Sequence, residues 1–207
     1  RLSGCIGGDK TASKTLNRAT DTTRQPGSTF KILAAYSAAL DAGGLTLASV
    51  QDDAPYTYAG ANGKSVNNYD RRYRGFTTLR EAITDSINIV TVKTLAQAGV
   101  SLGWQYVQEY GFTTVDSRDM NEALALGGIT QGVSNLELTA AYAAIANQGT
   151  YIKPKFYTKI LDHDGNVLID NTTPESHTVI KDTTAWLLTS AMEDVMTSGT
   201  GTSAYFG

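Results

Sequence analysis

The sequence predicts an α+β fold that is mostly helical. Helical patterns dominate the chain, a hairpin pattern comes late, and no strand–helix–strand alternation of the kind that builds a parallel sheet is present. The composition agrees with one folded domain, because 207 residues with 41% apolar and 18% charged side chains can bury a substantial core. No internal repeat or low-complexity linker divides the chain.

The first predicted helix begins at Gly27 and runs to about Ala42, before the C-cap signals of Gly43-Gly44. Its residues are apolar nearly all round, so we expect it to be buried. Before it, Arg1–Gly8 resembles the middle of a strand. After it, the segment 49–75 is rich in Asp, Asn, Gly and Tyr, which predicts loops and short strands.

A capping box at Thr78–Glu81 opens the next predicted helix. Residues at i and i+2 of one helix point about 200° apart, so Ser86 and Asn88 cannot face one site from an unbroken helix. Either the helix breaks at Ser86 or only one of the two residues is functional, and we predict a break. Asn88 then lies near the start of a second helix, which runs to about Gln97 and is ended by Gly99.

The remainder of the chain predicts two more helices, a hairpin and a final helix. These elements are a helix capped by Ser101 and running through Tyr110, a helix opened by the capping box Ser134–Glu137 and running to about Asn147, a β-hairpin within 150–171 with its turn at Asp162–Asn166, and a helix from Asp182 to about Met196.

Ser28 and Lys31 place a hydroxyl and an amine three residues apart at the start of the first helix. Side chains at i and i+3 share a helix face, about 5–6 Å apart at Cβ, so the lysine can reach the serine oxygen. A serine hydroxyl is a weak nucleophile until a nearby base takes its proton. Burial would lower the pKa of Lys31 from its usual value of about 10.4 and suit it to be that base. The alternative is an N-cap serine followed by a solvated lysine.

Composition argues against several function classes. The net charge of −3 gives no basic field for nucleic acid, and the basic run 70–74 is expected to be a solvated loop. No apolar run approaches the roughly 20 residues that span a bilayer, and no signal peptide is visible. The single Cys5 is expected to be a small buried residue, and without zinc-type spacing we expect no metal or other cofactor. His163 and His177 lack the arrangement of a Ser-His-Asp hydrolase.

Motifs typical of one known family run through nearly the whole chain. They are Asn17–Thr20, Arg24–Lys31 (with S-x-x-K at its end), Asn68–Asp70, Gly75–Ala82, Ser86–Asn88 (an S-x-N motif), Leu126–Gly128, Gly132–Val133, Ala141–Gly149 and Gly199–Thr202. Together these stretches resemble the transpeptidase domain of class A (bifunctional) penicillin-binding proteins.

The resemblance implies a penicillin-binding-protein/β-lactamase-like transpeptidase fold, of which the chain carries mostly the helical part. It implies acyl transfer on peptidoglycan stem peptides, in which Ser28 attacks the terminal D-Ala-D-Ala bond and Lys31 accepts the serine proton. Ser86 would relay that proton to the leaving nitrogen, and Asn88 would hold the substrate backbone. β-Lactam antibiotics would acylate Ser28 in place of the peptide.

One departure from the family concerns its third motif, K-T-G or K-S-G, which is not among the 207 residues. By resemblance it would follow soon after Gly207. We therefore expect residues 1–207 to be a partial transpeptidase domain without its C-terminal sheet strands. Since the missing strand would supply one oxyanion-hole donor, worth about 2.7–4 kcal/mol in kcat, we expect this piece alone to be badly impaired. The resemblance also implies a membrane-anchored parent with a glycosyltransferase domain, at the extracytoplasmic face of the bacterial cell membrane.

Three alternatives remain open from the sequence. A serine β-lactamase would need a glutamate for deacylation, and the nearest candidate, Glu122, is more simply a helix-start carboxylate. A β-lactam-sensing or structural module of the same fold would be acylated without cross-linking peptides. A plain helical interaction domain, with accidental motif matches, would use Ser28 for helix capping alone.

Overall fold

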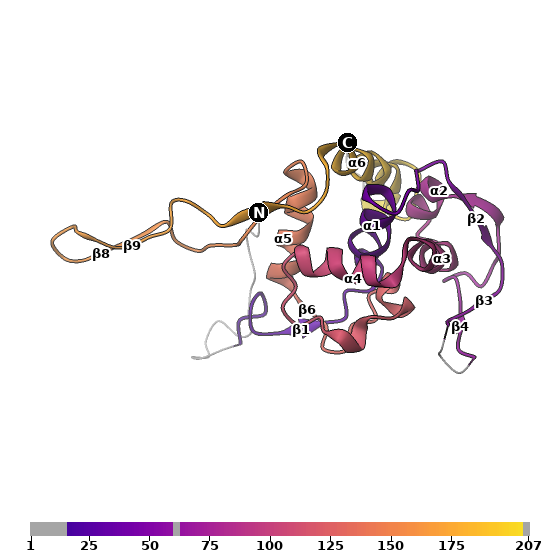
Figure 1. Ribbon diagram of the computed structural model, residues 1–207, viewed down its shortest axis with the longest axis horizontal. Coiled ribbons are helices and arrows are strands. Elements are labelled where there is room, and N and C mark those ends of the chain that lie inside the picture. The colour runs from indigo at the N-terminus through magenta and orange to yellow at the C-terminus, as the bar shows by residue number, and fades with distance from the viewer. Residues whose placement is uncertain (1–15, 60–62, 205–207) are drawn as a thin grey trace.

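The computed structural model describes residues 16–59 and 63–204 (Figure 1). The expectations of a strand at Arg1–Gly8 and of a buried Cys5 lie outside these residues. The helical elements are η1 (Gly27–Thr29), η2 (Ile32–Tyr36), α1 (Ser37–Asp41), α2 (Leu79–Thr84), α3 (Asn88–Ala98), α4 (Val100–Glu109), η3 (Ser117–Asp119), η4 (Glu122–Leu126), α5 (Asn135–Ala146), α6 (Asp182–Thr197) and η5 (Thr202–Ala204).

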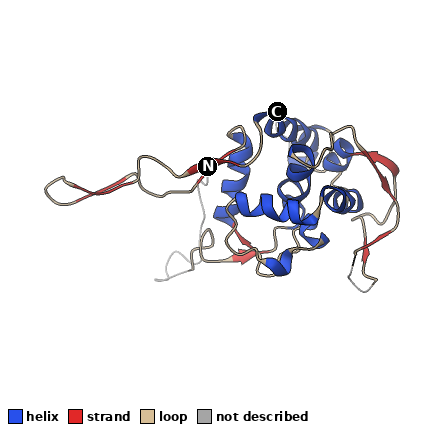
Figure 2. Cartoon of the chain, in the orientation of Figure 1, coloured by secondary structure: helices blue, strands red, loops and turns tan. Residues whose placement is uncertain are grey.

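The strands form antiparallel pairs: β1 (Thr23–Arg24) with β6 (Val133–Ser134), β2 (Val50–Asp53) with β5 (Gly75–Thr78), β3 (Tyr56–Thr57) with β4 (Ser65–Val66), β7 (Thr150–Ile152) with β10 (Ser176–Thr178), and β8 (Lys159–Leu161) with β9 (Val167–Asp170). Figure 2 shows the helices gathered in one body, with the strand pairs around its edge. The β8–β9 pair projects from that body as an arm.

The hairpin expected over 150–171 is shorter than predicted. β8 and β9 pair with each other, but β7 pairs with β10, a strand that the sequence analysis did not predict. Proline has no N–H to donate to a ladder, so Pro154 ends the pairing that begins at Thr150. The chain therefore leaves the body after β7, turns back through the β8–β9 arm and returns at β10.

The first helix extends over the range expected, but it is irregular. A 3₁₀ turn (η1) leads through Phe30 and Lys31 into a π-helical turn (η2), and α1 completes the helix. Phe30 through Ala39 are buried, as the apolar sequence predicted. At the start of α1, the Ser37 hydroxyl donates back to the carbonyl of Ile32 in the π turn at 2.9 Å and contacts the Tyr110 hydroxyl at 2.9 Å.

Helix α3 lies at the centre of the packing. It contacts η2, α1, α2, α4, η4 and β2, and buries Ile89, Val90 and Leu95 completely. The predicted break is confirmed, because α2 ends at Thr84 and α3 begins at Asn88.

Both capping boxes predicted from the sequence are present, at Thr78–Glu81 and at Ser134–Glu137. The predicted cap at Ser101 is wrong, because α4 begins at Val100. Gly99, with φ of 106°, is the one residue between α3 and α4 and is itself the N-cap of α4. Ser101 therefore lies inside the helix and cannot cap it. Within the described residues, we find no helix long and apolar enough to cross a membrane.

Gly149→Ala should destabilise the domain through crowding. Gly149 has φ of +85°, and a Cβ there would lie 1.9 Å from the carbonyl oxygen of Ile180. We expect a loss of about 2–4 kcal/mol in the free energy of unfolding, from left-handed strain plus overpacking. Chemical denaturation of the wild type and the variant measures this loss.

Gly165→Ala is the matched control, because Gly165 has the same φ of +85° but open space around it. Gly165→Ala should lower the free energy of unfolding by no more than about 2 kcal/mol, because only the left-handed strain contributes. Equal losses in the two variants would show that crowding by Ile180 contributes nothing.

Candidate active site

Lys31, directly before η2, carries a buried amine, and 3% of the residue is exposed. Its Nζ donates to the carbonyl of Ser86 at 2.6 Å, to the Ser86 hydroxyl at 2.9 Å and to Oδ1 of Asn88 at 2.6 Å. Burial lowers the pKa of Lys31 to about 7, because removal from water disfavours the charged ammonium. At neutral pH a large share of this amine is therefore uncharged and able to accept a proton.

Ser28 lies in the 3₁₀ turn η1 and is exposed. Lys31 comes three residues after Ser28, beyond the end of this turn. The two line a cavity of about 380 Å³ together with Ser86, and Ser28 and Ser86 also line a second cavity of about 560 Å³ with Asn88. The hydrogen bonds of the Lys31 amine to described residues all go to Ser86 and Asn88, and Ser28 is exposed on the wall of both cavities.

The turn that carries Ser28 is held from two sides. Gln25 exchanges hydrogen bonds with the backbone of Ile129, donating to its carbonyl and accepting from its N–H at 3.1 Å. The Tyr142 hydroxyl donates to the carbonyl of Thr29 at 2.6 Å. These contacts join the turn to the segment after η4 and to α5, which are far away in sequence.

Ser86 occupies the break between α2 and α3 in a left-handed conformation, with φ of 53°. Such a backbone is uncommon for a residue with a side chain and is found at sites where the surrounding structure determines it. Here it turns both the carbonyl and the hydroxyl of Ser86 toward the Lys31 amine. The two groups supply acceptors that a continuous helix would not present.

Asn88 begins α3, and its side-chain amide is oriented by two partners. Its Oδ1 accepts from Lys31 at 2.6 Å, and its Nδ2 donates to the carbonyl of Asn67 at 2.7 Å. An amide nitrogen carries two N–H donors, so one remains for another partner. The structure thus brings Lys31, Ser86 and Asn88 into direct contact and places Ser28 on the wall of the same cavity.

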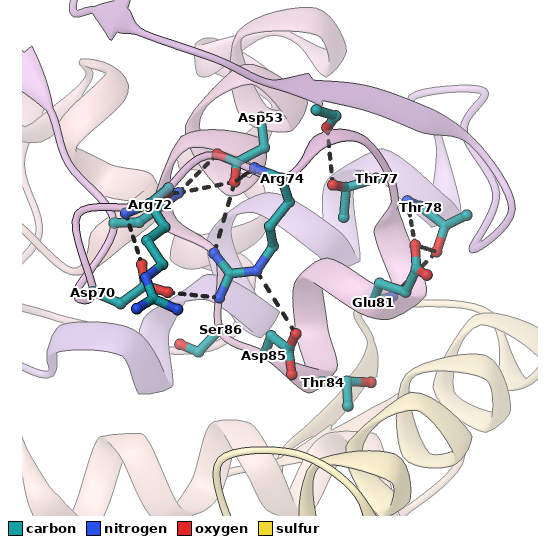
Figure 3. Close-up of polar contacts among 12 residues, drawn as sticks. Asp53, Asp70, Arg72, Arg74, Thr77, Thr78, Glu81, Thr84, Asp85 and Ser86 are labelled. Carbon is teal, nitrogen blue, oxygen red and sulfur yellow. Dashed lines mark hydrogen bonds and ion pairs between the residues drawn. The ribbon is translucent and has the colours of Figure 1, made fainter.

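Sequence reasoning missed a buried polar cluster beside the site. Asp53 is fully buried on β2, accepts from Asn68, and lies 3.7 Å from the guanidinium of Arg74 (Figure 3). Arg74 also pairs with Asp70 at 3.0 Å and approaches Asp85 at 3.9 Å. The stretch 68–70 was matched to the family, but nothing in the local pattern indicated which groups it would contact.

The other candidate groups lie elsewhere. The Glu122 carboxylate accepts from the Tyr56 hydroxyl and the Ala59 N–H, both at 2.9 Å, and so holds the segment around β3 in place. The ring of His177 contacts the backbone of Glu109 at 2.8 Å. Neither residue lines the two cavities that contain Ser28. In the residues that the structure covers, no group of three or more metal-ligating side chains occurs.

Comparison with known proteins gives one consistent result. The sequence model of one family, the penicillin binding protein transpeptidase domain, matches residues 6–205. Penicillin-binding protein 1F of Bacillus subtilis is 38% identical over 205 residues, which are 99% of this chain and 28% of that protein. The chain thus spans about a quarter of the length of the curated relatives that it matches.

Solved structures share the fold. Penicillin-binding protein 1A of Haemophilus influenzae aligns with a TM-score of 0.79 and 28% identity, over 92% of this chain and 33% of that one. The D,D-transpeptidase domain of a peptidoglycan glycosyltransferase from Eggerthella lenta aligns with a TM-score of 0.77 and 22% identity, over 95% of this chain and 54% of that one. The chain belongs to the transpeptidase domain family of penicillin-binding proteins.

Proposed function

We propose that this domain is a serine D,D-transpeptidase that forms peptidoglycan cross-links, with Ser28 as its nucleophile. The observation that carries the proposal is the buried Lys31 amine, hydrogen-bonded to Ser86 and Asn88 in the cavity that Ser28 lines. A desolvated amine with a pKa of about 7 is suited to take the proton of a serine at neutral pH. As substrates we propose stem peptides that end in D-Ala-D-Ala, a choice that membership in the family supports.

In the acylation step, the oxygen of Ser28 attacks the carbonyl carbon of the penultimate D-Ala while its proton passes to Lys31. The amide bond breaks, the terminal D-Ala leaves, and its nitrogen receives the proton through the Ser86 hydroxyl. The free N–H of the Asn88 amide donates to the peptide backbone of the donor strand. The product of this step is a serine ester of the shortened stem peptide.

In the second step, an amine from a neighbouring peptidoglycan strand attacks the ester. The acyl group moves to that nitrogen, the nitrogen gives up one proton to Lys31, and Lys31 returns a proton to Ser28. A β-lactam follows the first step only, because its opened ring keeps the leaving nitrogen attached at the site. The position of Glu122, bonded to Tyr56 and Ala59 away from the cavities, favours a transpeptidase over a β-lactamase that deacylates through a glutamate.

The setting of this activity follows from the same family. Stem peptides are exposed at the extracytoplasmic face of the bacterial cell membrane, and we propose that the domain works there. The relatives are about four times longer than the chain, and one solved neighbour is the D,D-transpeptidase domain of a peptidoglycan glycosyltransferase. We therefore propose that the domain acts beside a glycosyltransferase domain in a membrane-anchored protein.

Ser28→Ala should abolish covalent labelling by penicillin. In the natural protein that contains these residues, a fluorescent penicillin should form one adduct, which mass spectrometry of the digested protein places on Ser28. Ser117→Ala is the matched control, because Ser117 is an exposed serine outside both cavities, and labelling should persist. An adduct that survives in Ser28→Ala would refute the assignment.

The fate of the adduct separates the related functions. A transpeptidase keeps the penicillin adduct for long times and joins donor to acceptor peptides. Rapid release of hydrolysed penicillin would instead identify a β-lactamase, and a stable adduct without any peptide cross-linking would identify a sensor.

The rate of Ser28 acylation should rise with pH around neutrality. The base must be uncharged, and the uncharged fraction of an amine with a pKa of about 7 grows about tenfold from pH 6 to pH 8. Stopped-flow measurement of the second-order acylation rate with a penicillin tests this. Lys31→Arg, which stays charged, should be slow throughout. A wild-type rate that is flat across this range would contradict Lys31 as the base.

A further inference from the structure

The helix that carries Asn88 is capped by a residue from a distant loop. Ile87 occupies the N-cap position of α3 and has no side chain that can accept a hydrogen bond. Instead Oδ1 of Asn68 accepts from the N–H of Asn88 at 3.0 Å and of Ile89 at 3.2 Å. The first N–H groups of a helix have no partners within it, so this contact satisfies two of them.

The same loop orients the Asn88 side chain. The carbonyl of Asn67 accepts from Nδ2 of Asn88 at 2.7 Å, which directs Oδ1 of Asn88 toward the Lys31 amine 2.6 Å away. Asn67 and Asn68 therefore fix both the backbone and the amide of Asn88. A displacement of this loop would release one of the acceptors of the buried amine.

Asp53 in turn determines the orientation of Asn68. Nδ2 of Asn68 donates to both carboxylate oxygens of Asp53, at 2.8 and 3.0 Å, and to the carbonyl of Arg72 at 2.8 Å. An ionised carboxylate can only accept, so it requires the NH₂ side of the Asn68 amide. The amide oxygen must then face the opposite way, toward the N-terminus of α3.

Asp53 itself is a rigid support. It is fully buried at the end of β2, which pairs with β5, and it also accepts from the backbone N–H of Arg74 at 2.9 Å. Figure 3 shows its carboxylate facing both the backbone and the guanidinium of Arg74. A buried carboxylate is tolerated only with such partners, so its contacts with Asn68 and Arg74 are mutually dependent.

We propose that Asp53 and Asn68 are positioning residues for the acylation reaction. Through the cap on α3 they hold Asn88, and through Asn88 they hold the Lys31 amine in the cavity that Ser28 lines. Neither residue touches the reacting atoms. This inference rests on the function proposed above, because its readout is acylation of Ser28.

The test exchanges the two side chains. Asn68→Asp places two carboxylates in contact, and Asp53→Asn removes the group that orients the Asn68 amide. The double variant Asp53→Asn/Asn68→Asp has the composition and net charge of the wild type. In the double variant, the carboxylate at position 68 accepts from the first N–H groups of α3, and negative charge is favourable at a helix N-terminus. The amide at position 53 donates to the same carboxylate.

We expect Asn68→Asp to slow acylation of Ser28 by at least about tenfold, and the double variant to return within about threefold of the wild-type rate. The return is not expected to be complete, because the carbonyl of Arg72 loses its donor. Gly149→Ala is the stability control. It destabilises the domain at the junction of α5 and β7, outside both cavities, and should keep the wild-type rate while folded.

Two results would overturn the inference. One is a folded Asn68→Asp variant that is acylated at the wild-type rate. The other is a folded double variant in which acylation of Ser28 stays more than about tenfold slower than in the wild type. This second result decides the question even if the single variant does not fold. A wild-type protein without an adduct on Ser28 would refute the proposed function itself, and this outcome is distinguishable from both.

Discussion

The site depends on the desolvation of one amine that must keep its hydrogen bonds. A lysine in water is charged at neutral pH, and burial alone would leave its donors without partners at high cost. In this fold Lys31 loses its water but finds acceptors on Ser86 and Asn88 within 2.6–2.9 Å. Burial lowers the pKa of Lys31 to about 7, and the hydrogen bonds keep the side chain in place.

Much of the surrounding structure contributes to the burial of this amine or to its hydrogen bonds. The break between α2 and α3, with Ser86 in a left-handed conformation, turns two acceptors toward the amine. The buried first helix removes the amine from solvent, and the pair Asp53–Asn68 fixes the helix that carries Asn88. The geometry of the candidate site thus joins segments near positions 28, 53, 68 and 86, which only the tertiary fold brings together.

The sequence predicts what depends on local spacing. The separation of Ser28 from Lys31, the break required by Ser86 and Asn88, and the two capping boxes all follow from helical geometry over a few residues. The cap by Asn68 could not be predicted, because Asn68 and Asn88 are 20 positions apart in sequence. It also depends on Asp53, which binds the NH₂ group of Asn68 and so directs the amide oxygen toward α3. The pairing of β7 with β10 is likewise long-range. The predicted cap at Ser101 is wrong because Gly99 allowed α4 to begin earlier.

The most direct measurement is a titration of the Lys31 amine itself by NMR, with carbon-13 at the ε position of lysine and the signal assigned by its absence in Lys31→Arg. We expect this signal to titrate with a midpoint of about 7 in the folded protein without ligand. A midpoint near 10.4, the ordinary value for lysine, would mean that the amine is charged at neutral pH and cannot act as the base.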